Sequence, residues 1–268
     1  MKKISKGELK KLRTLLKEKK ARDESGQFVA EGIKIVSDMA AKGHVIDFVL
    51  VSSGFVRREY NKKIMEDMEG RLVPVYTAPN CDFQKLSSLQ NSQGILALVK
   101  KCEFPALEAV GEEEALFILC DGVQDPGNLG AIIRTSVAFG VDAVLLTGET
   151  VDVYNPKVVR ASSGMVLDVP VYDGCSAGKL KSLKEKGYRL LVSSPLKEAS
   201  KDILKVKRPK APLIIAFGSE GRGVSRQITD IADDFFHIPI AGGVDSLNVA
   251  AAAAITIYVF KEGRSLLI

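Results

Sequence analysis

The feature that most constrains the fold is a series of apolar segments in the second half of the chain, separated by helix-like stretches. Each segment is rich in Val, Ile and Leu and lacks the polar–apolar alternation of a half-exposed strand. The segments that predict strands are residues 116–121, 141–146, 189–193 and 213–217, with a further one at 235–240. Apolar strands that alternate with helices predict an α/β fold whose parallel sheet is covered on both faces.

A weaker alternation of the same kind precedes this region. Strand candidates at residues 45–51 and 94–100 flank helical patterns, and further helices are predicted at 5–20 and 31–42. Residues 101–114 contain Pro105, Gly111 and three consecutive glutamates, a composition typical of a linker. We therefore predict two α/β domains, residues 1–104 and residues 113–268.

The charge of the chain is concentrated at its start. Residues 1–22 contain ten Lys or Arg against Glu8 and Glu18, whereas the remaining 246 residues sum to −3. A basic arm of this kind favours a polyanionic partner, with nucleic acid first, and we predict that Lys10, Lys11 and Arg13 contact RNA. The arm could also be an amphipathic helix that only keeps the protein in solution.

Cysteine and histidine usage gives no indication of a metal site. The four cysteines are far apart and the two histidines, His44 and His237, do not cluster with them, so we expect reduced thiols and no bound metal. The longest apolar run, residues 249–260, is too short to span a bilayer, and the basic N-terminus has no apolar core behind it. The sequence thus favours a cytoplasmic protein.

Polar residues follow three of the predicted strands and suggest one composite site. Asn128 and Arg134 belong to the first junction, Glu220 lies in the glycine-rich second one, and Ser246 and Asn248 precede the last helix. Because ligands bind beyond the carboxyl ends of parallel strands, these side chains are expected to converge. Asn128, Ser246 and Asn248 could each be only a helix cap. A lone arginine in an apolar helix, in contrast, usually pairs with a carboxylate or a phosphate.

The glycine-rich second junction does not have the residue order of a phosphate-binding loop. A glutamate among its glycines would repel phosphate, so a neutral or cationic ligand fits better. Lys157 and Arg160 share one helical face and could hold an RNA backbone, although they could also form an ordinary surface pair.

The order of these motifs resembles the three motifs of the SpoU RNA methyltransferases, which belong to the SPOUT superfamily. The matching residues are Asn128 to Arg134, the stretch 214–223 around Glu220, and 238–240 followed by 246–249. The similarity covers about residues 115–262. Residues 22–36, with the stretch 28–32 within them, resemble the start of the L30e-like substrate-binding domain that precedes many SpoU domains.

The resemblance implies transfer of a methyl group from S-adenosylmethionine to a ribose 2′-hydroxyl of ribosomal RNA, with transfer RNA less favoured. It implies a trefoil knot near the C-terminus, a homodimer, and a cofactor lying against Gly218, Ile238 and Leu247. Arg134 matches the family's catalytic arginine. The polar active-site positions of the family fall on Asn128, Glu220, Ser246 and Asn248. Asp245 and Ala250 depart mildly from the usual family residues, Glu and Ser.

Two other functions remain open from the sequence. A non-catalytic RNA-binding or ribosome-assembly protein would explain the basic arm but not three polar junctions. A nucleotide-dependent oxidoreductase would need a Gly-x-Gly-x-x-Gly turn after its first strand, which is absent from residues 121–128.

Overall fold

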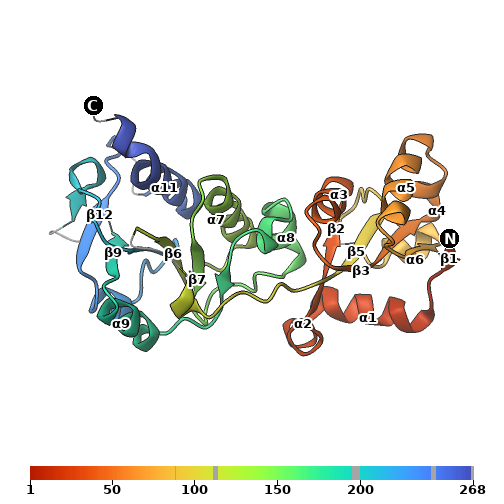
Figure 1. The fold of residues 1–268 in the computed structure, drawn as a ribbon, viewed down its shortest axis with the longest axis horizontal. Helices are drawn as coiled ribbons and strands as arrows, with labels where there is room; N and C mark the ends of the chain where they lie inside the picture. Colours follow the sequence, from red (N-terminus) through yellow and green to blue (C-terminus); the bar gives the residue numbers. More distant parts are fainter. Residues whose placement is uncertain (88, 111–113, 195–199, 243–245, 267–268) are drawn as a thin grey trace. The chain divides into compact units, whose positions relative to one another are not determined.

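The computed structural model describes residues 1–87, 89–110, 114–194, 200–242 and 246–266. The chain divides into two compact units (Figure 1). Unit 1 contains Met1–Glu103 and Asp152–Leu167, and unit 2 contains Phe104–Val151 and Asp168–Ile268. The sequence prediction placed residues 152–167 in the second domain, whereas their contacts in the structure are with unit 1.

Unit 2 is built on a seven-stranded sheet in which every pair of neighbouring strands is parallel, as the sequence predicted. The strand order is β10-β12-β9-β11-β6-β7-β8. The strands are β6 (Leu116–Asp121), β7 (Ala143–Leu146), β8 (Val171–Tyr172), β9 (Arg189–Ser193), β10 (Lys201–Asp202), β11 (Leu213–Gly218) and β12 (Asp234–His237).

Helices cover both faces of this sheet because alternate strand residues are apolar on each side. On one face, Phe117, Leu119, Ile214 and Ala216 pack against α9 and α10. Helices α7 and α11 lie side by side (Figure 1), and α11 also contacts β11. The helices are α7 (Pro126–Ala138), α9 (Ala177–Glu185), α10 (Arg226–Thr229) and α11 (Val249–Leu266), with 3₁₀ turns at Leu107–Ala109 and Ile203–Lys205. The predicted linker is partly ordered, since Leu107 is buried in this core.

Unit 1 contains a five-stranded mixed sheet with the order β1-β4-β3-β5-β2. Strand β5 runs antiparallel to β2 and β3, and the other pairs are parallel. The strands are β1 (Lys2–Lys3), β2 (Gln27–Glu31), β3 (Ile46–Ser52), β4 (Val75–Ala78) and β5 (Ile95–Lys100). The predicted helix at 31–42 begins two residues later, because Glu31 ends a strand whose five residues are all buried.

The basic N-terminal segment forms a helix that belongs to the core of unit 1. Ser5 and Glu8 form a capping box at its start, and Leu12 and Leu15 are buried against the sheet. The helices of unit 1 are α1 (Lys6–Lys17), α2 (Lys19–Ser25), α3 (Ile33–Ala41), α4 (Ser53–Val56), α5 (Lys62–Gly70), α6 (Asn80–Gln84) and α8 (Pro156–Ala161), with 3₁₀ turns at Glu59–Asn61 and Met165–Leu167.

Residues 152–167 are fixed to unit 1 by a buried ion pair and an aromatic contact. The Asp152 carboxylate accepts hydrogen bonds from Arg22 Nε at 2.8 Å and lies 2.6 Å from its Nη2, and both side chains are less than one-tenth exposed. Arg22 also donates to the Leu15 carbonyl. The ring centroids of Phe28 and Tyr154 are 4.9 Å apart. Removing one partner of such a buried pair usually costs about 3–5 kcal/mol.

Burial of the sulfhydryl groups predicts sharply unequal cysteine reactivity. Burial, with a smaller effect of Asp121, raises the pKa of Cys120 from 9.0 to about 12, and burial raises the pKa of Cys175 to about 11. Cys81 is exposed. Because the thiolate is the nucleophile, we expect a maleimide at pH 8 to label Cys81 at least about a thousandfold faster than Cys120. Mass spectrometry of timed samples, with Cys81→Ser as control, measures this. Comparable rates at Cys120 in the folded protein would contradict it.

Candidate active site

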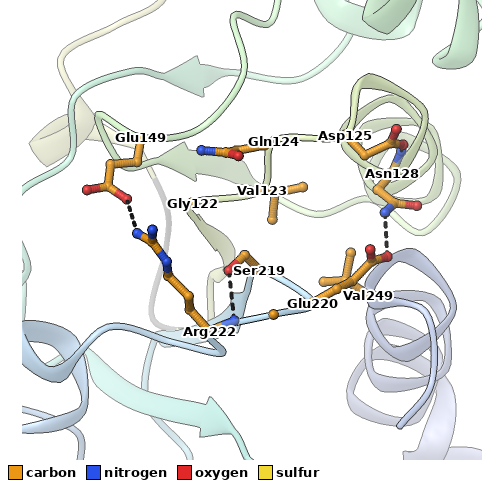
Figure 2. A pocket seen from close by; sticks show the side chains of 11 residues that line it. Gly122, Val123, Gln124, Asp125, Asn128, Glu149, Ser219, Glu220, Arg222 and Val249 are labelled. Carbon is orange, nitrogen blue, oxygen red and sulfur yellow. Dashed lines mark hydrogen bonds and ion pairs between the residues drawn. The ribbon is translucent and has the colours of Figure 1, made fainter.

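A polar pocket of about 280 Å³ lies in unit 2 beyond the carboxyl ends of three neighbouring strands, β11, β6 and β7 (Figure 2). Parallel strands end at a common edge of the sheet, and the loops that follow them line the pocket. The lining residues are Gly122, Val123, Gln124, Asp125, Asn128, Glu149, Ser219, Glu220, Gly221, Arg222 and Val249. Segments far apart in the sequence therefore share one site.

The loop after β6 places Asn128 in the first turn of α7. Asp125, not Asn128, caps this helix, because its carboxylate accepts a hydrogen bond from the Asn128 backbone N–H at 2.9 Å. Pro126 then occupies the first helical position, where its missing N–H costs nothing. The Asn128 side chain is consequently available for contacts across the pocket.

The turn after β11 requires glycine at position 218. Gly223 donates to the Ser219 carbonyl and closes a tight loop, so the backbone of Gly223 lies directly over Gly218. A Cβ atom on Gly218 would lie 1.9 Å from the Gly223 carbonyl carbon. The far end of the turn is tied to β6, since the buried Asp121 carboxylate accepts from the Ser225 N–H at 2.6 Å. The turn therefore holds Glu220 in a fixed place.

A hydrogen-bond network joins side chains from the three predicted motifs. Glu220 Oε1 accepts from Asn128 Nδ2 at 2.7 Å and from Asn248 Nδ2 at 3.0 Å. The Asn248 amide also donates to Asn128 Oδ1 at 2.9 Å. Figure 2 shows the contact between Asn128 and Glu220 across the space between α7 and the turn after β11. One carboxylate thus orients two amides that are 120 residues apart in the chain.

Asn248 has two functions in this structure. Its side-chain oxygen accepts from the backbone N–H groups of Ala250 and Ala251, so it caps α11, while its NH₂ group takes part in the network. The two interpretations left open by the sequence, helix cap and site residue, are therefore both compatible with the observed contacts.

The charges that line the pocket are mostly negative. Asp125, Glu149 and Glu220 are carboxylates, and Arg222 is the cation among the lining residues. Arg222 Nη1 lies 3.8 Å from Glu149 Oε2, and both side chains are more than 70% exposed, so this pair adds little stability. Gln124, Glu149 and Arg222 were not singled out by the sequence analysis, because no motif marks them. The lining suits a neutral or cationic ligand better than a phosphate.

The other predicted site residues lie near these elements but outside the pocket lining. Arg134 is exposed on α7, six residues after Asn128, and Ser246 is exposed two residues before Asn248. Ile238 follows β12 and Leu247 precedes α11, and both are half-buried. Asp245, where the sequence departs from the family pattern, and the adjacent Gly243 lie outside the described residues. The catalytic and cofactor roles of all these residues stay predictions.

The residues predicted to bind RNA all lie in unit 1. Lys10, Lys11 and Arg13 are exposed on α1, and Lys157 is exposed on α8. Arg160 is different, because its side chain is only 19% exposed and its Nη1 lies 3.7 Å from Oε2 of the buried Glu31. Part of its charge is therefore already balanced within the unit.

Two kinds of feature are absent from the described ranges. Within them, no cluster of three or more His, Cys, Asp or Glu side chains could hold a metal ion. Among the same residues, no helix has both the length and the apolar character needed to cross a bilayer.

Comparison with known proteins matches both halves of the chain. A model of the SpoU rRNA Methylase family matches residues 115–258, which contain the whole pocket and its hydrogen-bond network. The chain belongs to the SpoU rRNA methylase family. A second model, the MRM3-like substrate binding domain, matches residues 6–97 of this SpoU methylase.

Individual relatives agree with this assignment. A Staphylococcus haemolyticus protein assigned to the TrmH family of tRNA/rRNA methyltransferases is 32% identical over 239 residues, 86% of this chain and 93% of the relative. An S-adenosylmethionine-bound rRNA methyltransferase from Sinorhizobium meliloti has a TM-score of 0.82 and 26% identity, covering 100% of this chain and 98% of the other. A solved RNA 2′-O ribose methyltransferase has a TM-score of 0.80 and 28% identity, with both chains covered completely.

Proposed function

We propose that this SpoU methylase transfers a methyl group from S-adenosylmethionine to a ribose 2′-hydroxyl of ribosomal RNA. The observation that carries the proposal is the network of Asn128, Glu220 and Asn248 at the carboxyl edge of a parallel sheet. The 2′-hydroxyl as acceptor is supported by the similar RNA 2′-O ribose methyltransferase, and ribosomal RNA by the Sinorhizobium meliloti enzyme. Transfer RNA is the less favoured substrate.

The residues around the pocket fit S-adenosylmethionine chemically. The pocket lining contains three carboxylates and one guanidinium, and this excess of negative charge favours binding of the positively charged sulfonium of S-adenosylmethionine. Gly218 is the last residue of β11 and Ile238 follows β12. These two strands flank β9 and run parallel to it, so they end at the same edge of the sheet. Ile238 and Leu247 are half-buried apolar residues suited to an adenine ring, and Gly218 presents backbone with no side chain. When bound, the cofactor supplies an electrophilic methyl group.

The protein's part in the reaction is to place the ribose oxygen and to stabilise the charge that develops on it. The hydroxyl loses its proton to a neighbouring RNA phosphate oxygen or to water as the oxygen takes the methyl group, which leaves a neutral thioether in place of the sulfonium. Arg134 orients the ribose and its phosphate and stabilises the developing alkoxide. A guanidinium stays charged at neutral pH, so electrostatic stabilisation suits it better than removal of a proton. Glu220 holds the amides of Asn128 and Asn248 in position, and Ser246 contributes a hydroxyl beside them.

The direct test is methyl transfer from tritiated S-adenosylmethionine to ribosomal RNA, followed by mass-spectrometric mapping of the modified nucleotide. The expected product is a single 2′-O-methylated ribose. Base methylation would contradict the proposed acceptor. Tight RNA binding with no S-adenosylmethionine binding in equilibrium dialysis would favour the non-catalytic alternative.

The same proposal assigns RNA contacts to the exposed face of α1 and to α8. Lys10, Lys11 and Arg13 are expected to contact phosphates, with Lys157 and Arg160 extending that surface. Alanine at the three α1 positions is expected to lower the slope of log K against log salt by about 2, because each phosphate contact contributes about 0.7 for single-stranded RNA. Leu12 and Leu15 stay in place, so the helix keeps its packing.

Filter binding between 50 and 300 mM KCl measures this slope. The exposed Lys207, replaced by alanine in unit 2, serves as a control for the loss of a surface charge. An unchanged slope in the triple variant would show that the α1 charges only keep the protein in solution.

Three further features belong to the proposal. We expect a homodimer, supported by Ile255 and Tyr258 on α11, which are more than 40% exposed although apolar or aromatic. We also expect a trefoil knot formed by the chain around β11, β12 and α11. We also propose a cytoplasmic location, which is compatible with ribosomal RNA as substrate.

A further inference from the structure

Unit 1 contains a second hollow, of about 480 Å³, within the stretch that matches a substrate-binding domain. It lies where the parallel strands β3 and β4 end and where the antiparallel strand β5 begins, so three loops meet at one end of the sheet. The residues that line it are Ser52, Gly54, Phe55, Arg58, Asn80, Phe83, Gln84, Gln90, Asn91, Ser92, Gln93 and Gly94. Its volume is in the range of small-ligand sites.

The composition of this lining is unusual for the unit. It contains no carboxylate and one cation, Arg58. Five of the eight Asn and Gln residues of unit 1 line the hollow. The other three are used internally: Gln27 donates to Asp47, Asn61 donates to the Phe55 carbonyl, and Asn155 caps α8. Amides are thus gathered in this hollow and not scattered over the surface.

Two of these amides are held with their acceptor side toward the protein. Asn80 Oδ1 accepts from the Gly54 N–H at 2.7 Å and from the Ser53 hydroxyl at 3.1 Å. Gln93 Oε1 accepts from the Ile33 N–H at 2.7 Å. With their oxygens occupied in this way, the NH₂ groups of both residues are the parts left to contact a ligand. The hollow therefore offers hydrogen-bond donors in fixed orientations.

The loop that forms one wall is held by contacts within unit 1. Ser92 donates to Oε1 of Glu31 at 2.8 Å, and the Glu31 side chain is only 2% exposed. Gly94 has a φ of +84°, and a Cβ there would lie 2.6 Å from the Ser52 hydroxyl, so only glycine allows this approach to β3. Contacts of this kind lower the entropy that a site loses when it binds a ligand.

We infer that this hollow binds one unpaired nucleotide of the RNA substrate. An unpaired base exposes the ring nitrogens and carbonyl oxygens that Asn80 and Gln93 can contact, whereas a duplex hides these edges. Arg58 is placed to pair with the phosphate of the same nucleotide. The inference rests on the proposed function in that it takes RNA as the substrate, and it adds recognition of an unpaired nucleotide far along the sequence from the methyl-transfer site.

The test uses Asn80→Asp and Gln93→Glu in the full chain. Each change keeps the oxygen that accepts the backbone N–H, so the fold is preserved, but it replaces the donor with a negative oxygen. The matched control is Gln227→Glu, the same chemical change at an exposed position of unit 2. Fluorescence anisotropy measures binding to a random-sequence single-stranded 20-nucleotide RNA and to a fully paired RNA of equal length, and calorimetry measures S-adenosylmethionine binding.

We expect each pocket variant to weaken single-strand binding by about tenfold or more, since loss of one hydrogen bond and repulsion of acceptors act together. Duplex binding, S-adenosylmethionine binding and the control should change less than twofold. Unchanged single-strand affinity would overturn the inference, as would an equal loss on both RNAs. A further outcome would also overturn it. If the variants keep their RNA affinity but no longer bind ribosomal proteins from which the RNA has been removed, the ligand of the hollow is a protein.

These measurements distinguish failure of the inference from failure of the proposed function. If the wild-type chain binds single strands through the hollow but methylates no RNA, the proposed function fails and the inference stands. If it methylates RNA and the pocket variants do so with unchanged kcat/KM and affinity, the inference fails and the proposed function stands.

Discussion

Replacing Arg134 with alanine is expected to abolish methyl transfer, lowering kcat by about 10³-fold or more, while S-adenosylmethionine still binds. In the proposed mechanism Arg134 faces the developing alkoxide, where a guanidinium would stabilise the transition state more than the ground state. Arg134 lies on the same helix as Asn128, whose side chain already belongs to the hydrogen-bond network. Steady-state methylation of ribosomal RNA gives kcat, and calorimetry gives the cofactor affinity.

The matched control is Arg226→Ala, which also removes an exposed guanidinium, from the short helix α10 of the same unit. Its kcat should stay within about twofold of wild type, because an exposed ion pair contributes little. Turnover of Arg134→Ala close to the wild-type value would remove Arg134 from the mechanism. Loss of cofactor binding in that variant would assign it a binding function instead.

Gly218→Ala is expected to destabilise the protein by about 3 kcal/mol or more and to eliminate methyl transfer. The added methyl carbon would overlap the Gly223 backbone at 1.9 Å, and a backbone atom cannot move aside as a flexible side chain can. The turn must therefore open, and it carries Glu220, which orients Asn128 and Asn248. Urea unfolding measures the stability, and calorimetry measures the S-adenosylmethionine affinity.

Gly221→Ala provides a control within the same turn. A Cβ at Gly221 meets no atom within 4 Å, and its backbone is outside the left-handed region. Its free energy of unfolding should fall within about 0.5 kcal/mol of wild type. Equal stability of the two variants would show that the turn has another accessible conformation, and that Gly218 does not fix the position of Glu220.

The parallel sheet of unit 2 could be predicted because a strand that is buried on both faces is apolar at nearly every position, and this pattern is visible in the sequence. Strands β6 and β9 occupy the residues that the sequence indicated. Strand β2 was missed, because Glu31 and Gln27 look like surface residues. Only the fold shows that Glu31 is buried and accepts from Ser87 and Ser92, about 60 positions along the chain.

The candidate site could be predicted in part for a related reason. Asn128, Glu220 and Asn248 stand in motifs directly after strands or before a helix, and parallel topology places such positions together. No sequence motif distinguishes Glu149 and Arg222 from other charged residues in exposed loops. The sequence therefore offered no reason to place them at the site. The capping function of Asp125 was hidden as well, because Asn128 is an equally good cap by residue type.

Asp152–Leu167 belong to unit 1 although unit 2 residues precede and follow them in the chain. This limits how the two units could be exchanged by recombination during evolution. These residues lie inside the stretch that matches the methylase family, yet they supply the carboxylate for Arg22 and the ring that packs on Phe28. A gene fragment ending near codon 104 would leave that guanidinium buried without its counter-ion. Recombination could therefore not exchange the half that matches the substrate-binding model as a simple cassette, because part of its interior is encoded within the other half.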